Sequence, residues 1–286
     1  MNFRSSFGSH SLVWKGLLLG MLVLAHRGAV AQEGMKYPVS VVVGRDSTVY
    51  VADRDLPGIW KFADRKWSVY FQGSKKFRTP MNAVRCLAID HEGKLLAADT
   101  ASREIYRFDD AGQPQPLTKG NVGTPVALAV ARDGTIYASD LEIQRIVRIP
   151  AAGGEPEPII ELAAVRGLTM DAEGRLIAVC HGKKNSVLRF SPDGKEQTVL
   201  LEERPFSFSH HIVLGASGEA YIADGYAKTI WKLEANSQPT PFVSGEPLKN
   251  PVGVALLDGN LLIADPHVKA ILRRTAEGKL EVLGKD

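Results

Sequence analysis

The sequence predicts an all-β protein, a six-bladed β-propeller with four antiparallel strands in each blade. Three observations predict it: a phrase that recurs six times, the regular spacing of its copies, and strand-like composition without a helical period. The first copy, VYVAD, ends at Asp53, and the fourth, LIAVCH, ends at His181. The others, LLAAD, IYASD, AYIAD and LLIAD, end at Asp99, Asp140, Asp224 and Asp265. Successive copies lie 46, 41, 41, 43 and 41 residues apart, a period typical of propeller blades.

Each copy begins with a short apolar strand and a tight turn. The first strands read SVVVG, CLAID, ALAVA, GLTMD, HIVLG and GVALL. The turn carries Ser47 in the first copy and glycine in the other five: Gly93, Gly134, Gly174, Gly218 and Gly259. Glycine suits this place because a hairpin turn needs a positive φ, which is costly for other residues. The second strand then ends at the recurrent Asp, or at His181 in the fourth copy.

A third and a weaker fourth strand complete each copy. The third strands read IWKF, IYRF, IVRI, VLRF, IWKL and ILRR, and their alternation indicates one buried and one wetter face. The fourth strands include WSVYF, EPIIEL, QTVLLE and LEVLG. One such sheet cannot bury both faces alone, so the six sheets must stack on one another around an axis. The expected blades are 37–72, 81–119, 123–162, 164–203, 208–245 and 249–284.

Residues 1–31 are predicted to be a secretory signal peptide. Arg4 and Lys15 precede the apolar run GLLLGMLVLA, and AVA stands directly before Gln32. The apolar run is short for a membrane span, so we expect export to the periplasm or medium and no span after cleavage. A retained anchor is the alternative. The mature chain, 32–286, is then the propeller.

The charge balance and the cysteines exclude some partners and bonds. The chain has 35 Lys and Arg against 32 Asp and Glu, and three of the basic residues lie in 1–31 with no acidic residue. The mature chain is therefore formally neutral, which removes the main support for nucleic-acid binding. Cys86 and Cys180 are expected to be buried, unbridged thiols.

The repeat resembles the NHL repeat and the gluconolactonase-like six-bladed propellers, the SMP-30/gluconolactonase/LRE-like superfamily. Its cleanest copy is VALAVARDGTIYASDLEIQRIVRI, at 126–149, and the resemblance covers essentially the whole mature chain. Such a motif is specific for fold and poorly specific for function. The resemblance implies that the first strand of each blade lines a central channel and begins at its mouth, where the second strand ends.

The mouth is therefore the predicted site. The six rim positions, one before each first strand, carry Val39, Arg85, Val126, Arg166, His210 and Val252. Two guanidiniums can hold a carboxylate or phosphate through paired hydrogen bonds, and a neutral imidazole beside them can move a proton. A solvated rim is the alternative interpretation. The five Asp residues are expected to cap turns, and His181 to break their ring.

Neighbouring residues extend this prediction. His211 is expected to point between blades as a packed core histidine. Tyr226, Asn82, Asn250 and the loop 73–80 are expected to overhang the mouth, because loops of this kind carry specificity.

The leading functional hypothesis is a binding protein that takes a small anion or a protein partner at the mouth. Its ligand-binding residues would be Arg85, Arg166, His210, His181 and Tyr226, and no cofactor is predicted. Ligand identity, turnover and oligomeric state stay open.

The alternative is a metal-dependent lyase or hydrolase of the gluconolactonase, virginiamycin lyase or amidating lyase type. His210 would then be catalytic, and zinc or calcium would be bound. The resemblance implies oxygen ligands at the six rim positions for a gluconolactonase, and none of those positions is Asp, Glu or Asn here. For the lyases it implies a histidine from each of three blades. Here only His210 occupies such a place, while His181 and His267 lie at or beyond second-strand ends.

Overall fold

The computed structural model describes Met1 and residues 34–76, 79–182, 184 and 186–285. The predicted signal peptide lies outside the described residues, apart from Met1. Residues 34–286 make one compact unit. In the part of the chain that the structure describes, no helix is long and apolar enough to cross a membrane.

The unit consists of six four-stranded antiparallel sheets, which confirms the predicted six-bladed propeller. Blades 1 to 3 contain β1 (Pro38–Val43), β2 (Val49–Asp53), β3 (Gly58–Ala63), β4 (Lys66–Gln72), β5 (Val84–Ile89), β6 (Leu95–Asp99), β7 (Glu104–Phe108), β8 (Pro114–Pro116), β9 (Pro125–Val130), β10 (Ile136–Asp140), β11 (Arg145–Ile149) and β12 (Glu157–Glu161). Blades 4 to 6 contain β13 (Val165–Met170), β14 (Leu176–Cys180), β15 (Val187–Phe190), β16 (Gln197–Leu201), β17 (Ser209–Leu214), β18 (Ala220–Asp224), β19 (Thr229–Leu233), β20 (Thr240–Ser244), β21 (Gly253–Leu257), β22 (Asn260–Asp265), β23 (Ala270–Arg274) and β24 (Leu280–Val282).

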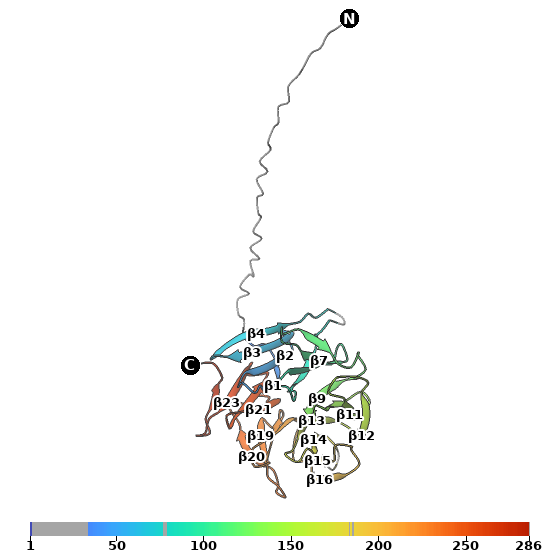
Figure 1. Cartoon of the computed structure of the whole chain (residues 1–286). Coiled ribbons are helices and arrows are strands. Elements are labelled where there is room, and N and C mark those ends of the chain that lie inside the picture. Colours follow the sequence, from blue (N-terminus) through green and yellow to red (C-terminus); the bar gives the residue numbers. More distant parts are fainter. Residues whose placement is uncertain (2–33, 77–78, 183, 185, 286) are drawn as a thin grey trace. The chain divides into compact units, whose positions relative to one another are not determined.

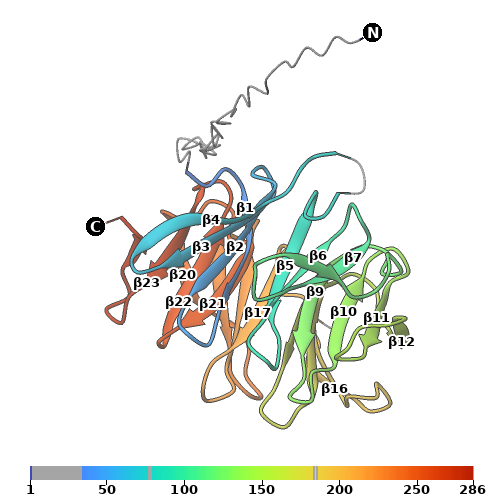
Figure 2. The same ribbon diagram turned by 45° about the horizontal axis from the view of Figure 1, so that its top comes forward.

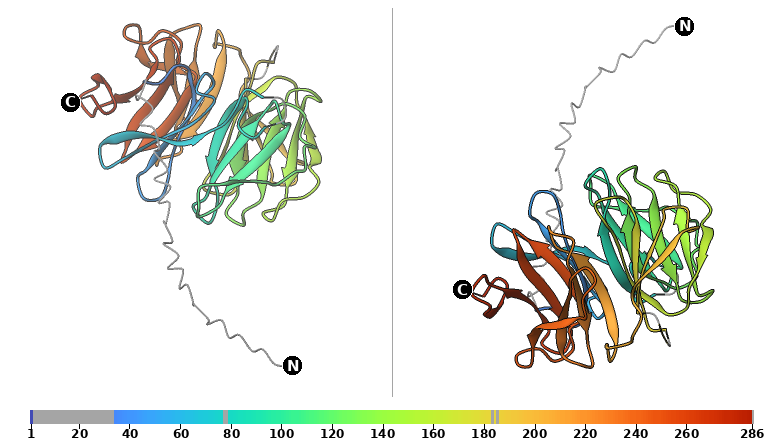
Figure 3. Two further views of the ribbon diagram at one scale, coloured as in Figure 1. Left: turned by 90° about the horizontal axis from the view of Figure 1, so that it is seen from above. Right: turned by 90° about the horizontal axis from the view of Figure 1, so that it is seen from below.

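Every blade is a simple meander of four consecutive strands, so no strand is exchanged to close the ring. The first strand of each blade contacts the first strands of its two neighbours, and β1 contacts β21. The blades therefore follow one another around a central channel, and the blue first blade lies beside the red last one (Figures 1 and 2). Figure 3 gives the views from above and below, in which the blue and red blades lie on one side and the green blades on the other.

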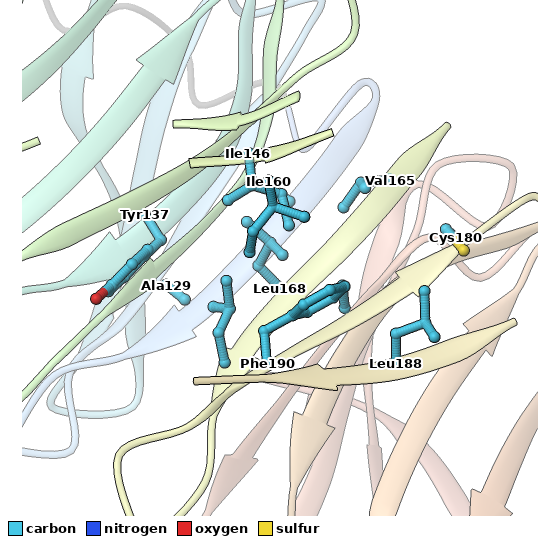
Figure 4. Packing of buried hydrophobic residues seen from close by; sticks show 12 residues of the cluster. Ala129, Tyr137, Ile146, Ile160, Val165, Leu168, Cys180, Leu188 and Phe190 are labelled. Atoms are coloured by element: carbon cyan, nitrogen blue, oxygen red, sulfur yellow. The ribbon is translucent and has the colours of Figure 1, made fainter. Parts of the chain in front are cut away.

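The hydrophobic core lies between the blades rather than inside any one of them. Between blades 3 and 4, Ile146 and Ile160 of one sheet pack in the same cluster as Leu168 and Phe190 of the next (Figure 4). Burying each such side chain contributes about 1.5–3 kcal/mol, which a single sheet with two bare faces would lose. The stacking of blades is therefore what stabilises the fold.

The two cysteines lie buried in these cores without a disulfide between them, as the sequence predicts. Cys86 belongs to the cluster between blades 2 and 3, and Cys180 to the one between blades 3 and 4. Burial raises the pKa of both thiols. Both are therefore protonated, unreactive packing groups at neutral pH.

In every blade except the fourth, the recurrent Asp joins two backbone segments at the end of the blade that faces the channel mouth. Asp53 is fully buried, and its carboxylate accepts the backbone N–H groups of Lys36 and Tyr37 at 2.8 and 2.9 Å. It also accepts those of Asp55 and Leu56 at 3.0 and 3.3 Å. The carboxylate thus joins the segment before the first strand to the turn after the second. Asp99, Asp140, Asp224 and Asp265 make the equivalent pairs of bonds in their blades.

The strand register corrects one assignment made from the sequence. Pro38 pairs with Asp53 in blade 1, and Val165 pairs with Cys180 in blade 4. Cys180, not His181, is therefore the counterpart of the recurrent Asp. A cysteine fits there because its thiol is buried in the inter-blade core. His181 is the next residue along, the position that Arg54 holds in blade 1, and its N–H donates to the carbonyl of Ala164.

Candidate functional site

The rim residues project into the channel because the first strands bulge where they begin. In blades 1 to 4 the register skips one residue, so that Val39, Arg85, Val126 and Arg166 have no cross-strand partner. In blade 5 His210 and His211 are unpaired opposite the single unpaired Ala223, so this strand again carries one extra residue. A β-bulge bends the strand and re-aims the extra side chain. Here it directs one side chain from each of blades 1 to 5 toward the mouth.

These side chains surround a pocket of about 270 Å³ at the mouth. The pocket brings together Arg85, Arg166 and His210, the three residues that the sequence aligned at the rim. Its full lining is Tyr37, Val39, Ser40, Arg54, Arg85, Cys86, Thr100, Thr124, Val126, Leu141, Arg166, His210, His211, Asn250 and Val252. The lining includes three guanidiniums and no carboxylate, so it favours an anion.

Two of the guanidiniums are available to a ligand. Arg54 is already paired with Asp55 at 3.1 Å and lies over the ring of Tyr37. Among the described residues, Arg85 and Arg166 have no carboxylate partner, and the buried Nε of Arg166 has no hydrogen-bond acceptor. Burial and then the charge of Arg85 lower the pKa of Arg166. A bound anion would stabilise the charged form of Arg166 and so raise this pKa again.

Phe208 is the centre of the aromatic side of the mouth, and the sequence analysis did not single it out. Its ring centroid lies 4.6 Å from that of His181, 4.8 Å from that of His210 and 5.0 Å from that of Tyr226. The guanidinium of Arg166 lies 5.2 Å from the same centroid. The cluster therefore joins four of the five predicted ligand-binding residues. In the sequence, the indication of this role is the position of Phe208 directly before Ser209 and the two histidines.

His210 is a neutral imidazole at physiological pH. Burial, followed by the charge of Arg166, lowers its pKa to about 4, and Asp224 only partly opposes this. Burial also lowers the pKa of His181, with Arg204 and Arg166 adding to the effect. His181 contacts Arg204 through Nε2 and does not line the pocket itself.

His211 is buried beside the backbone of Val254 in blade 6, in agreement with the expectation that it packs between blades. It also borders the mouth pocket and a channel space of about 390 Å³ that is lined by the first strands of all six blades. Burial lowers its pKa to about 4, against an opposing backbone interaction with Val254.

The remaining predicted residues divide between the pocket and its surroundings. Asn250 lines the pocket, whereas Asn82 donates to the carbonyl of Lys76 at 2.7 Å, in the described part of the loop 73–80. Tyr226 is 73% exposed and overlies Phe208. Gly225 lies under the site: a Cβ there would lie 2.3 Å from Asn250 Oδ1 and 3.0 Å from His210 Nε2. This position therefore has to be glycine for both side chains to keep their places.

Fold and site together define a six-bladed propeller whose functional groups gather at one mouth of the channel. Residues 21–205 match the family model of the SMP-30/Gluconolactonase/LRE-like region. The chain therefore belongs to this family, as the repeat suggested.

Solved structures support the same fold. Virginiamycin B lyase from Staphylococcus aureus is 18% identical with a TM-score of 0.65, over 87% of this chain and 85% of that one. A gluconolactonase from Xanthomonas campestris is 15% identical with a TM-score of 0.68, over 82% and 84%. A chain of a nidogen/laminin complex is 16% identical with a TM-score of 0.69, over 82% and 90%. No curated protein matches the sequence. At these identities the likeness is one of fold, and such a fold is poorly specific for function.

The residues at the mouth do not fit the divalent metal that the family resemblance implies. Hard cations need oxygen ligands, and the pocket lining offers no carboxylate while presenting three guanidiniums that would repel a cation. Within the described ranges, no three His, Cys, Asp or Glu side chains lie close enough together to hold a metal. His210 and His181 each contact the ring of Phe208, and His267 instead packs against Tyr37. A three-histidine zinc site is therefore not formed by these groups.

Proposed function

We propose that this protein is an exported binding protein that takes a small anionic molecule, a carboxylate or phosphate, at the mouth of its channel. The observation that carries the proposal is that Arg85 and Arg166, both without a carboxylate partner among the described residues, face one pocket that contains no acidic side chain. The predicted signal peptide supports export.

Binding would follow from charge and desolvation. Arg166 is half-buried and Arg85 more exposed, so an incoming anion meets one guanidinium at the surface and a second deeper in the pocket. Charge-assisted hydrogen bonds are stronger away from water, and a planar guanidinium can hold two oxygens at once. At about 270 Å³ the pocket suits a molecule smaller than a drug-sized ligand. Phe208 and Tyr226 would border the part of the ligand that leaves the pocket.

Titration calorimetry of the purified protein with citrate, glycolate and inorganic phosphate tests the proposal. We expect at least one of these anions to bind, and Arg85→Gln or Arg166→Gln to weaken its binding about tenfold each, because each loses a charge-assisted hydrogen bond. Raising the salt concentration should weaken anion binding more in Arg166→Gln, which retains the exposed Arg85, than in Arg85→Gln, which retains the half-buried Arg166.

Arg145→Gln is the matched control. Arg145 pairs with Glu161 on the exposed outer part of blade 3, so its loss should leave anion affinity unchanged. The proposal would be abandoned if none of the three anions bound, or if the double variant Arg85→Gln/Arg166→Gln bound as tightly as the natural protein.

One observation favours a second candidate, a lyase. His210 is a neutral base in the same pocket as two guanidiniums, so it could accept a proton from a carbon beside a carbonyl while the guanidiniums stabilise the resulting anion. With a pKa of about 4, His210 is a weak base, which is why binding is the first proposal. The two candidates differ in turnover. A lyase would consume streptogramin B or a related substrate and would lose kcat on His210→Gln while retaining anion affinity.

A further inference from the structure

A second and larger cavity lies between blades 4 and 5, at the end of the propeller away from the mouth. Its volume is about 870 Å³, and it is bounded by the turn after β13 and the turn after β17. These turns join first to second strands, so they lie opposite the mouth, where the first strands begin. The cavity shares no residue with the mouth pocket. It is called the blade 4–5 cavity below.

A side chain that crosses the equivalent seam after blades 1 and 3 is missing at this cavity. In the turn after β1, Arg45 reaches the carbonyl of His91 in the next blade. In the turn after β9, Arg132 donates to the carbonyl of Ala172 at 2.8 Å. The equivalent residue of blade 4 is Ala172 itself, since the residue before each of these positions makes the same turn hydrogen bond. A methyl group cannot cross the seam, so the space stays open.

The blade 4–5 cavity also contains a cation without a partner. The third strand of each blade carries Lys or Arg at one position. In blade 3 that residue is Arg148, which pairs with Glu157 across the strands at 2.6 Å. In blade 4 it is Arg189, and its cross-strand neighbour is Thr198. Among the described residues, Arg189 makes no ion pair or side-chain hydrogen bond.

The acidic groups around the cavity already have ion-pair partners. Asp171 and Glu173 share Arg175, each at 2.7 Å. Glu234 pairs with Lys232 at 2.7 Å. Among the described residues, the half-buried guanidinium of Arg189 is therefore the charged group of the lining that has no ion pair.

Part of the rest of the lining is apolar. Met170, Leu200 and Leu214 are half-buried at the cavity surface, and Ile177 and Val187 lie buried beneath. A cavity of this size is in the range that small-molecule sites occupy. An apolar floor with one free guanidinium is complementary to a molecule that has one anionic end and an aliphatic body.

We propose that the blade 4–5 cavity binds an amphipathic monocarboxylate. Its carboxylate pairs with Arg189, in the place that Glu157 takes beside Arg148 in blade 3. Its aliphatic chain lies over Met170, Leu200 and Leu214. This site is independent of anion binding at the mouth.

Titration calorimetry of the full chain with octanoate tests this, with octylammonium as the ligand of equal length and opposite charge. We expect saturable octanoate binding and much weaker octylammonium binding. Arg189→Gln should weaken octanoate binding about tenfold or more, because it removes the charged end of the contact. Arg148→Gln, the same change at the equivalent position of blade 3, should leave it within twofold.

Two more variants locate the site. Ala172→Arg should abolish binding by filling the seam as Arg45 and Arg132 do, with thermal unfolding to verify that it folds. Arg85→Gln/Arg166→Gln should retain octanoate binding even where it loses anions at the mouth. The proposal is overturned if the natural protein does not bind octanoate, if Arg189→Gln binds it normally, or if the mouth variant loses it.

Discussion

Replacing Asp53 with alanine is expected to lower the free energy of unfolding by about 3–5 kcal/mol. The buried carboxylate accepts four backbone N–H groups and, at 3.1 Å, the indole N–H of Trp60. Without it these donors are left in a site that water reaches poorly, and each unsatisfied buried donor costs about 1–3 kcal/mol. Urea unfolding at neutral pH would measure the change.

Two variants control for this result. Asp53→Asn keeps one acceptor oxygen and should recover part of the stability. Asp133→Ala removes an exposed carboxylate whose hydrogen bonds lie within its own turn, among them the N–H of Thr135 at 2.9 Å, and should cost less than about 1 kcal/mol. If Asp53→Ala lowered the free energy of unfolding no more than Asp133→Ala, the recurrent Asp would not be what stabilises the mouth end of the blade.

The fold could be predicted from the sequence because its strongest signals are local. A positive φ at Gly93, Gly134 or Gly174 and a buried cap at Asp53 or Asp99 each constrain a few adjacent residues. Such constraints recur in every blade and leave the same letters at the same spacing. Once they fix four strands per repeat, stacking follows from the need to bury both faces. The burial of the two cysteines follows from the same pattern.

The site was predictable only in part, because it depends on register and on contacts between blades. The sequence places Arg85, Arg166 and His210 at equivalent positions, which is correct. Each of their strands carries one extra residue at the same place, so the bulge does not shift one blade against another. The same alignment separated His211 from His210, and His211 is buried beside the backbone of Val254 in the next blade. His181 was aligned one residue early because Cys180 does not resemble the Asp that it replaces.

Contacts between distant segments were the other missing information. Phe208 contacts His181 of the preceding blade and Tyr226 of its own blade, and no spacing rule joins these three residues. The blade 4–5 cavity likewise involves a missing contact between blades, because the side chain of Ala172 is too short to reach blade 5. An alanine in an exposed turn gives no sign that an arginine fills the equivalent seam elsewhere. Both features become visible only when blades are compared in space.

Lowering the pH from about 7 to 5 is expected to destabilise the protein by about 2 kcal/mol through each of two histidines, His210 and His211. Both have a pKa lowered to about 4 in the folded state, from an ordinary value of 6.5. Between pH 6.5 and 4 these histidines bind protons in the unfolded chain but not in the folded chain, so stability falls as the pH falls. The full penalty is reached below pH 4, and above 6.5 the contribution vanishes.

Urea unfolding at the two pH values, without added anion, separates this effect from the titration of other groups. The natural protein should lose about 4 kcal/mol more than the double variant His210→Gln/His211→Gln, and each single variant should remove about half of that difference. For His210 the neighbours that set the pKa are Arg166, Asp224, His181 and Arg85, and for His211 the backbone of Val254. Equal losses in the natural protein and the double variant would mean that these histidines are not held neutral by burial. A saturating anion at the mouth should narrow the difference for His210 alone, since it would compensate the guanidiniums that disfavour the imidazolium, and His211 should be unaffected.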